Sequence, residues 1–205
     1  MGFYEKHVFP RFMDFTTGSK RIREEREKAL APAYGDVLEI GFGTGRNLPH
    51  YPEAVTSLEA VDPADMLPGR VARRIAEARV PVEVVHLGAE RLPFEDGRFD
   101  CVVSTLTLCT IPDAVAALGE VRRVLKPEGR FLFLEHGRSD DERVARWQDR
   151  LNPLNRCLAC GCHLNRAIDA LVREAGLRIE RLDRYALRGA PRVLAEIYRG
   201  VARPA

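Results

Sequence analysis

Short apolar, β-branched runs alternate with stretches of helical spacing through most of the chain. Five of these runs have the length of a buried strand, and each is bounded by Gly, Pro or Asp. They are Val37–Ile40, Val55–Val61, Val82–His86, Phe99–Ser104 and Arg130–Glu135. Helical spacing separates several of them, at Met66–Ala78 and Ala114–Leu125. Strands that alternate with helices favour a parallel sheet with helices on both faces.

The two ends of the chain carry different patterns. Phe3–Phe15 is rich in aromatic residues, which stand among charged ones. Ser19 is placed to cap a helix that runs to about Ala31. The charges of this helix alternate in sign, which is typical of a solvated face. A polar segment follows Glu135, and beyond it the pattern predicts a helix at Arg166–Ala175 and strands near Arg178–Tyr185 and Val193–Val201. No repeat or linker divides the chain, so we expect one doubly wound α/β domain.

Composition narrows the functional classes. The 205 residues include 32 Lys plus Arg and 30 Asp plus Glu, so a net charge of +2 gives no electrostatic case for nucleic acid as partner. No apolar run approaches the roughly 20 residues of a membrane span, and no signal peptide is evident at the N-terminus. An odd count of 5 cysteines does not suggest a disulfide framework. We therefore expect a cytoplasmic protein.

A glycine-rich stretch directly after the first predicted strand is the main candidate for a ligand site. Gly41, Gly43 and Gly45 would let the backbone approach a ligand, and the N–H groups of a following helix could receive a carboxylate. A dinucleotide fingerprint would need a third glycine where Arg46 stands. Asp62, about 20 residues further on, is placed to bind ribose hydroxyls. The trio could otherwise be a simple strand-to-helix turn.

Several motifs, in order, resemble those of class I S-adenosylmethionine-dependent methyltransferases of the quinone-methyltransferase-like branch. They are Glu39-x-Gly41-x-Gly43-x-Gly45, Asp62-Pro63, Ala89-Glu90-Arg91-Leu92-Pro93-Phe94 with Phe99-Asp100, and Glu120-Val121-x-Arg123-Val124-Leu125-Lys126-Pro127-x-Gly129. One position departs from the family. Many relatives have Asp where this chain has Gly88, so the adenine contact is expected from the backbone near Ala89 and from Glu90.

The resemblance implies a fold, a methyl donor and a role for each segment of the chain. The fold is a mostly parallel, seven-stranded Rossmann-like sheet with an antiparallel last strand. Residues 1–34 would form a helical cap, 35–136 the donor-binding core, and 137–205 the acceptor-side segment with the last strands. The donor would be S-adenosyl-L-methionine. Its expected contacts are Glu39, Gly41, Gly43, Gly45, Asp62, Pro63, Met66, Ala89, Glu90 and Thr105.

A closer resemblance points to the thiol methyltransferase branch. It rests on Leu106-Thr107-Leu108-Cys109, Glu135-His136, Trp147-Gln148, Leu151-Asn152-Pro153 and Gly161-Cys162-His163-Leu164-Asn165-Arg166. That branch usually has Thr in place of Asn165, and its N-terminal hydrophobic anchor is not seen here. We expect a small-molecule acceptor, thiol, quinone-like or lipid-like, with peripheral membrane contact left open. The oligomeric state is not predicted.

An activated sulfonium methyl group needs alignment and removal of water more than a catalytic side chain, so transfer would be an in-line displacement. His136 and His163 are candidates to orient or deprotonate the acceptor, although either could simply satisfy local backbone groups. His7, with the aromatic N-terminal segment, could cap the site or pack in the core. Cys109 is expected to be a small buried hydrophobe.

The cysteine-rich stretch has a zinc-type Cys-x-x-Cys spacing. Its candidate ligands are Cys157, Cys160, Cys162 and His163. Adjacent Cys162 and His163 would strain to share one tetrahedral ion, and no second pair stands elsewhere, so no metal is expected. Two other functions remain open: a donor-binding regulatory protein without catalysis, and a nicotinamide oxidoreductase.

Overall fold

A computed structural model describes Tyr4 and residues 8–205 and has one central sheet of seven strands. The strands are β1 (Gly35–Ile40), β2 (Val55–Val61), β3 (Val82–Val85), β4 (Phe99–Thr105), β5 (Leu125–His136), β6 (Leu177–Ala186) and β7 (Glu196–Pro204). Their order is β3-β2-β1-β4-β5-β7-β6. All neighbours pair in parallel except β7, which is antiparallel to β5 and β6. The predicted fold class is confirmed.

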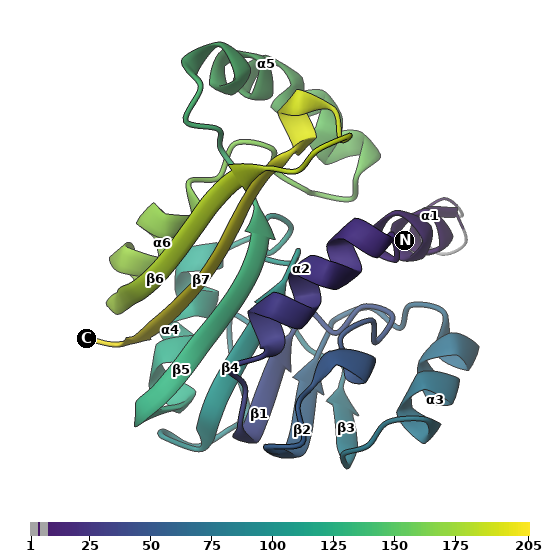
Figure 1. The fold of residues 1–205 in the computed structure, drawn as a ribbon, viewed down its shortest axis with the longest axis vertical. Coiled ribbons are helices and arrows are strands. Elements are labelled where there is room, and N and C mark those ends of the chain that lie inside the picture. Colours follow the sequence, from purple (N-terminus) through teal and green to yellow (C-terminus); the bar gives the residue numbers. More distant parts are fainter. Residues whose placement is uncertain (1–3, 5–7) are drawn as a thin grey trace.

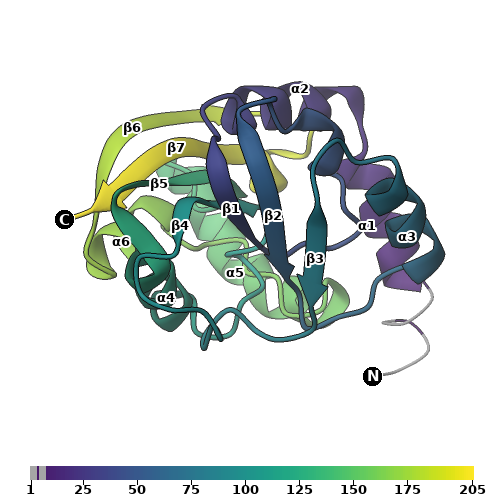
Figure 2. The same ribbon diagram turned by 90° about the horizontal axis from the view of Figure 1, so that it is seen from below.

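Six α-helices in the described part of the chain surround this sheet (Figure 1). They are α1 (Phe9–Thr17), α2 (Lys20–Leu30), α3 (Pro68–Ala76), α4 (Ala114–Val124), α5 (Glu142–Leu158) and α6 (Ile168–Glu174). Two short 3₁₀ turns, η2 (Leu48–His50) and η3 (Arg192–Leu194), complete the elements. Figure 2 shows α2 on one face of the sheet, and α4 and α6 on the other.

Alternation along the central strands builds a core on each face. Phe131 and Phe133 of β5 point to the face covered by α4 and α6, whereas Leu132 between them points to the face of α2. Val102 and Val103 of β4 divide in the same way. Strands buried on both faces read as continuous apolar runs, which explains why these strands were evident from sequence.

Three elements differ from the sequence expectation. Residues 142–158, in the segment read as polar, form α5, whose N-terminus is capped by Asp141 accepting the N–H groups of Arg143 and Val144 at 2.9 and 3.4 Å. The last strand begins at Glu196, because Arg192–Leu194 form the η3 turn. No α-helix follows the glycine loop, where the chain makes only the three-residue η2 turn containing Pro49. The expected helix N-terminus for a carboxylate is therefore absent there.

The charged helix α2 is not simply a solvated face. Ser19 stands at its N-cap without a side-chain hydrogen bond. Glu25 and Arg26 are buried, because their charges meet partners on other elements. The Glu25 carboxylate accepts a hydrogen bond from the Tyr185 hydroxyl and forms an ion pair with Arg199 at 2.6 Å. A sequence pattern of alternating charge does not reveal which charges find such partners.

Candidate active site

The glycine loop connects the end of β1 to the η2 turn and adopts a left-handed backbone. The φ angles of Gly41, Gly43 and Gly45 are 78°, 57° and 73°. A Cβ on Gly41 would lie 2.1 Å from the Thr107 side chain, so this glycine is needed for space as well as for conformation. A Cβ on Gly43 would meet nothing within 4 Å, so the left-handed φ, and not a lack of space, favours glycine there. The backbone N–H of Gly43 donates to a carboxylate partner.

That partner is Asp62, which follows β2. Its Oδ2 accepts the N–H of Gly43 at 2.7 Å, and its Oδ1 accepts the N–H of Ala64 at 2.8 Å. The side chain is buried, and burial raises the pKa of this carboxyl while the two backbone N–H groups oppose the shift. Each carboxylate oxygen keeps a free lone pair for a ligand hydroxyl.

Glu39 and Thr105 are joined through a residue that sequence reasoning did not single out. Asn47 donates to Glu39 Oε1 at 3.0 Å and to Thr105 Oγ1 at 3.1 Å. The side-chain oxygen of Asn47, Oδ1, accepts from Arg26 Nε at 2.9 Å. Tyr51 donates its hydroxyl to Glu39 Oε2 at 2.7 Å. Burial raises the pKa of Glu39 to about 7, against these hydrogen bonds and the nearby guanidinium.

A cavity of about 810 Å³ opens over these groups, within the size range of small-molecule and cofactor sites. Nine of the ten predicted donor contacts line it: Glu39, Gly41, Gly43, Asp62, Pro63, Met66, Ala89, Glu90 and Thr105. Gly45 does not, since a Cβ there would meet Phe42 and Leu48 at 3.2 and 3.3 Å. Gly45 therefore shapes the turn.

The Gly88 position also lines the cavity, together with its neighbour Glu90. A Cβ on Gly88 would lie 2.6 Å from Glu90 Oε2. The Glu90 carboxylate thus occupies the space that a side chain at position 88 would take, and its expected contact with the adenine stays a prediction.

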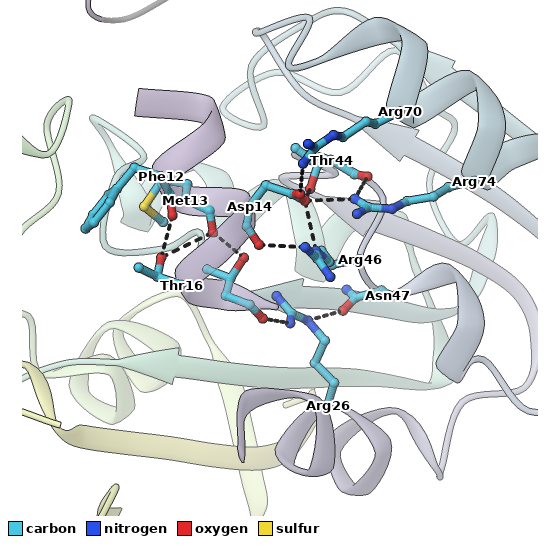
Figure 3. A network of polar contacts seen from close by, with 11 residues as sticks. Phe12, Met13, Asp14, Thr16, Arg26, Thr44, Arg46, Asn47, Arg70 and Arg74 are labelled. Atoms are coloured by element: carbon cyan, nitrogen blue, oxygen red, sulfur yellow. Dashed lines mark hydrogen bonds and ion pairs between the residues drawn. The ribbon is translucent and has the colours of Figure 1, made fainter. Parts of the chain in front are cut away.

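Helix α1 lines one side of the cavity. Its polar attachment to the core centres on the Asp14 carboxylate, and the carbonyl oxygens of Asp14 and Thr17 also accept from Arg46 and Arg26 at 2.7 and 2.5 Å (Figure 3). Asp14 is buried and receives Arg46 Nε at 2.8 Å, an Arg70 nitrogen at 2.6 Å and an Arg74 nitrogen at 2.9 Å. Thr44 of the glycine loop donates to it at 2.7 Å. Burial alone would raise the pKa of Asp14, but these hydrogen bonds hold it well below its usual range.

The predicted N-terminal cap includes α1, and only some of its apolar residues face the cavity. Phe9, Pro10 and Met13 of α1 line the cavity, whereas Phe12 and Phe15 are exposed. Phe3 and His7, which also entered that prediction, lie outside the described residues.

The opposite side of the cavity is formed by the segment after β4. Leu106, Thr107, Thr110, Ile111 and Pro112 line it, together with Cys160. Buried Glu135 shapes this segment because its carboxylate accepts the N–H groups of Thr107 at 2.9 Å and of Leu108 at 3.1 Å, and the hydroxyl of Ser104 at 2.6 Å.

The two candidate catalytic histidines are not among the residues that line the cavity. His136 Nε2 lies 3.0 Å from the Sγ atom of Cys162, and the backbone N–H of His163 donates to the carbonyl oxygen of Cys109 at 2.8 Å. Cys109 is buried, as expected, while Cys157 is exposed on α5. The roles of both histidines stay predictions.

Residues 38–133 match the methyltransferase domain family. Thiol S-methyltransferase TMT1B of Rattus norvegicus is 32% identical over 175 residues, 78% of this chain and 71% of that protein. Demethylmenaquinone methyltransferase of Thermus thermophilus is 36% identical over 128 residues, 61% of this chain and 58% of that protein. Phosphatidylethanolamine N-methyltransferase of Cereibacter sphaeroides is 28% identical over 170 residues, 81% and 82% of the two chains.

Solved structures give the same fold. A SAM-dependent methyltransferase of Leishmania major superposes with a TM-score of 0.71 at 16% identity, covering 98% of this chain and 80% of that one. The chain therefore belongs to the class I S-adenosylmethionine-dependent methyltransferases, enzymes whose methyl donor is S-adenosyl-L-methionine. Within that class, its sequence is similar to thiol S-methyltransferases. Family membership gives no support to the nicotinamide alternative.

Among the residues that the structure describes, no helix is both long enough and apolar enough to cross a bilayer.

Proposed function

We propose that this enzyme transfers the methyl group of S-adenosyl-L-methionine to the sulfur of a small, largely apolar thiol. The observation that carries this proposal is the composition of the cavity away from the glycine loop. There the cavity is lined by Phe9, Met13, Thr110, Ile111, Pro112 and Cys160, and no histidine or lysine is among its described lining residues. Of the lining carboxylates, Asp14 is already held by three arginines, and the others are at or next to predicted donor contacts, namely Glu39, Asp62, Asp65 and Glu90.

An acceptor in such surroundings must supply its own nucleophile. A thiol with a pKa of about 8.5 is a few per cent thiolate at neutral pH and is then strongly nucleophilic. A quinol, hydroxyl or ammonium acceptor needs a positioned base to reach the same state. Similarity to thiol S-methyltransferase TMT1B supports the same choice.

The residues around the glycine loop fit the donor. Gly43 leaves open space for its approach, Asp62 has free lone pairs for ribose hydroxyls, and buried Glu39 offers a carboxylate to an ammonium group. Ala89 and Glu90 would contact the adenine. When bound, the donor supplies a sulfonium-activated methyl group.

The chain's own residues would then align the acceptor and exclude water. Phe9 and Met13 of α1 cover the cavity from one side, and Thr110 and Ile111 bound it from the other. The thiolate sulfur forms a bond to the methyl carbon as the sulfonium bond breaks in line, which leaves a thioether and S-adenosylhomocysteine. The thiol proton goes to solvent before transfer.

Methyl transfer from labelled donor can be measured with three acceptor classes: thiols of graded pKa, demethylmenaquinol and phosphatidylethanolamine. We expect transfer to thiols. We also expect the inflection of the pH–rate profile to move with the pKa of the thiol used, because no protein base sets it. Asp62→Ala is the control that assigns the activity to this site, since it should lose most of the transfer at limiting donor.

Three outcomes would overturn the proposal. Transfer to the quinol or the phospholipid but not to thiols would assign a different acceptor, and an inflection fixed at one pH for every thiol would reveal a protein base. Donor binding without transfer to any acceptor would favour the non-catalytic, regulatory alternative.

A further inference from the structure

Three side chains with soft or borderline ligand atoms converge beside the cavity. They are Cys109, His136 and Cys162, whose ligand atoms all lie within 4.8 Å of one another. The closest pair is His136 Nε2 and Cys162 Sγ, at 3.0 Å. In the described part of the chain, no other His, Cys, Asp or Glu side chain joins this group.

The three residues come from segments that are distant in sequence and are each held by backbone contacts. Cys109 follows β4, and its carbonyl oxygen accepts the N–H of His163 at 2.8 Å. His136 ends β5, where it pairs with Ile197 of β7. The carbonyl oxygen of Cys162, in the connection from α5 to α6, accepts from Asn155 Nδ2 at 2.7 Å. The backbone of each of the three residues is therefore held in place, with the ligand atoms within 4.8 Å of one another.

We propose that Cys109, His136 and Cys162 form a binding site for a thiophilic divalent cation, Zn²⁺. Two thiolates and one imidazole are the ligand types that zinc prefers, and a Cys₂His set leaves a fourth tetrahedral position for water or another exogenous ligand. Each thiol loses its proton to solvent when its sulfur binds, while His136 binds as the neutral imidazole. Binding thus releases up to two protons per ion.

This ligand set differs from the one that the Cys-x-x-Cys spacing suggests. Cys157 is exposed on α5 and Cys160 lines the cavity, so Cys162 alone of that cysteine stretch reaches the cluster. The site lies directly behind the cavity wall. Thr110, next to Cys109, has its Oγ1 3.5 Å from that sulfur and also lines the cavity. A bound ion would connect β4, β5 and the α5–α6 connection at this wall, whichever acceptor the enzyme uses.

The test measures metal content and affinity of the full chain, purified under reducing conditions without added metal. We expect one zinc per chain by elemental analysis. After removal of the zinc, titration against a chromophoric chelator should show tight rebinding. Cys109→Ser and Cys162→Ser should each weaken zinc binding by more than about 100-fold, because each removes a direct ligand and even outer-shell partners are worth 10–100-fold. Cys157→Ser is the matched control and should bind zinc as the unchanged protein does.

Cobalt provides a second measurement. Co²⁺ in the same site should give sulfur-to-metal charge-transfer absorption and intense tetrahedral visible bands, weakened in both ligand variants. Donor affinity measured on each variant shows whether it is folded. The proposal fails if the unchanged protein neither holds nor rebinds zinc. It also fails if folded Cys109→Ser and Cys162→Ser keep their zinc, or if thiol titration finds Cys109 and Cys162 joined as a disulfide in place of a metal.

Discussion

Asp62 connects two segments that are separate in sequence. Its two oxygens accept N–H groups from the glycine loop and from its own turn, at 2.7 and 2.8 Å, and so fix the position of the loop relative to the end of β2. Because the carboxylate is also buried, its remaining lone pairs are an unusually well-oriented acceptor for hydroxyl groups of a ligand.

We predict that Asp62→Ala weakens binding of S-adenosyl-L-methionine by about 1–3 kcal/mol, which corresponds to about 5- to 150-fold in Kd, because ligand hydroxyls and two backbone N–H groups lose their acceptor. Isothermal titration provides the measurement. Glu59→Gln is the control, since Glu59 is paired with Arg98 at 3.0 Å, away from the cavity lining, and should leave the affinity unchanged. Equal affinity in Asp62→Ala would mean that the ribose binds elsewhere.

A second residue-scale effect concerns Glu39, whose pKa burial raises to about 7 from an ordinary value of 4.5. The folded state therefore holds a proton that the unfolded chain has already lost in this interval. The corresponding stabilisation is complete below pH 4.5 and is lost as the pH rises through 7. The shift corresponds to about 3 kcal/mol.

Glu39→Gln should remove this part of the pH dependence, because the amide does not titrate. Urea unfolding of the donor-free protein at pH 5 and pH 8 tests the prediction. The unchanged protein should lose about 2.5 kcal/mol more than the variant between these two values. If both lose the same free energy, Glu39 does not titrate in this range.

At the scale of elements, α1 depends on polar contacts more than on apolar packing. Only Pro10 and Asp14 of this helix are buried, and Phe15 is 81% exposed. We therefore expect the ion pairs of Asp14 with arginines of the glycine loop and of α3 to be the main contacts that keep α1 over the cavity.

We predict that Asp14→Asn lowers the local opening free energy of α1 by about 1–3 kcal/mol, since three guanidinium groups lose their counter-charge. Amide hydrogen exchange of α1 provides the readout, and donor affinity should fall with it. Arg74→Gln should produce a smaller effect of the same kind. Arg73→Gln is the control, because Arg73 pairs with exposed Glu77 instead. Unchanged exchange in Asp14→Asn would contradict the prediction, because the remaining contacts of α1 would then hold the helix without the carboxylate charge.

The strands, and the residues that line the cavity around the glycine loop, were predictable because their signals are local. The run Val37–Ile40 is apolar throughout, and the motif from Glu39 to Gly45 lies in seven consecutive positions. Helix α5 also has local signals that were missed, namely capping Asp141 and apolar residues Val144, Trp147, Leu151 and Leu154 at helical spacing. Its exposed apolar face and internal Pro153 obscured them.

The contacts made by single side chains across the fold were not predictable. Asp14 meets Arg74 across 60 positions of sequence, and His136 meets Cys162 across 26. The residues next to Asp14 or His136 in the sequence do not indicate these partners, because the topology of the fold brings each pair together. The hydrogen bonds by which Asn47 joins Glu39 and Thr105 were not predictable for the same reason.

At the scale of the whole molecule, segments from both ends of the chain pack into the core of the central sheet. The sheet is continuous from β3 to β6, and β7 pairs with β5 along Phe131–His136. Leu30 of α2 packs in the cluster with Val37 and Leu132, and Ile168 of α6 packs in the cluster with Phe131. Removing either end would expose a face of the sheet.

This arrangement predicts one cooperative unfolding unit for residues 1–205. Differential scanning calorimetry should show a single transition whose calorimetric and van't Hoff enthalpies agree. For 205 residues the enthalpy should be about 140 kcal/mol near 60 °C. S-adenosyl-L-methionine should move the whole transition upward, because the donor binds only the folded state. Two resolved transitions, or a donor that shifts only one of them, would mean that the segment after residue 136 unfolds as a separate unit and would contradict the single-domain prediction.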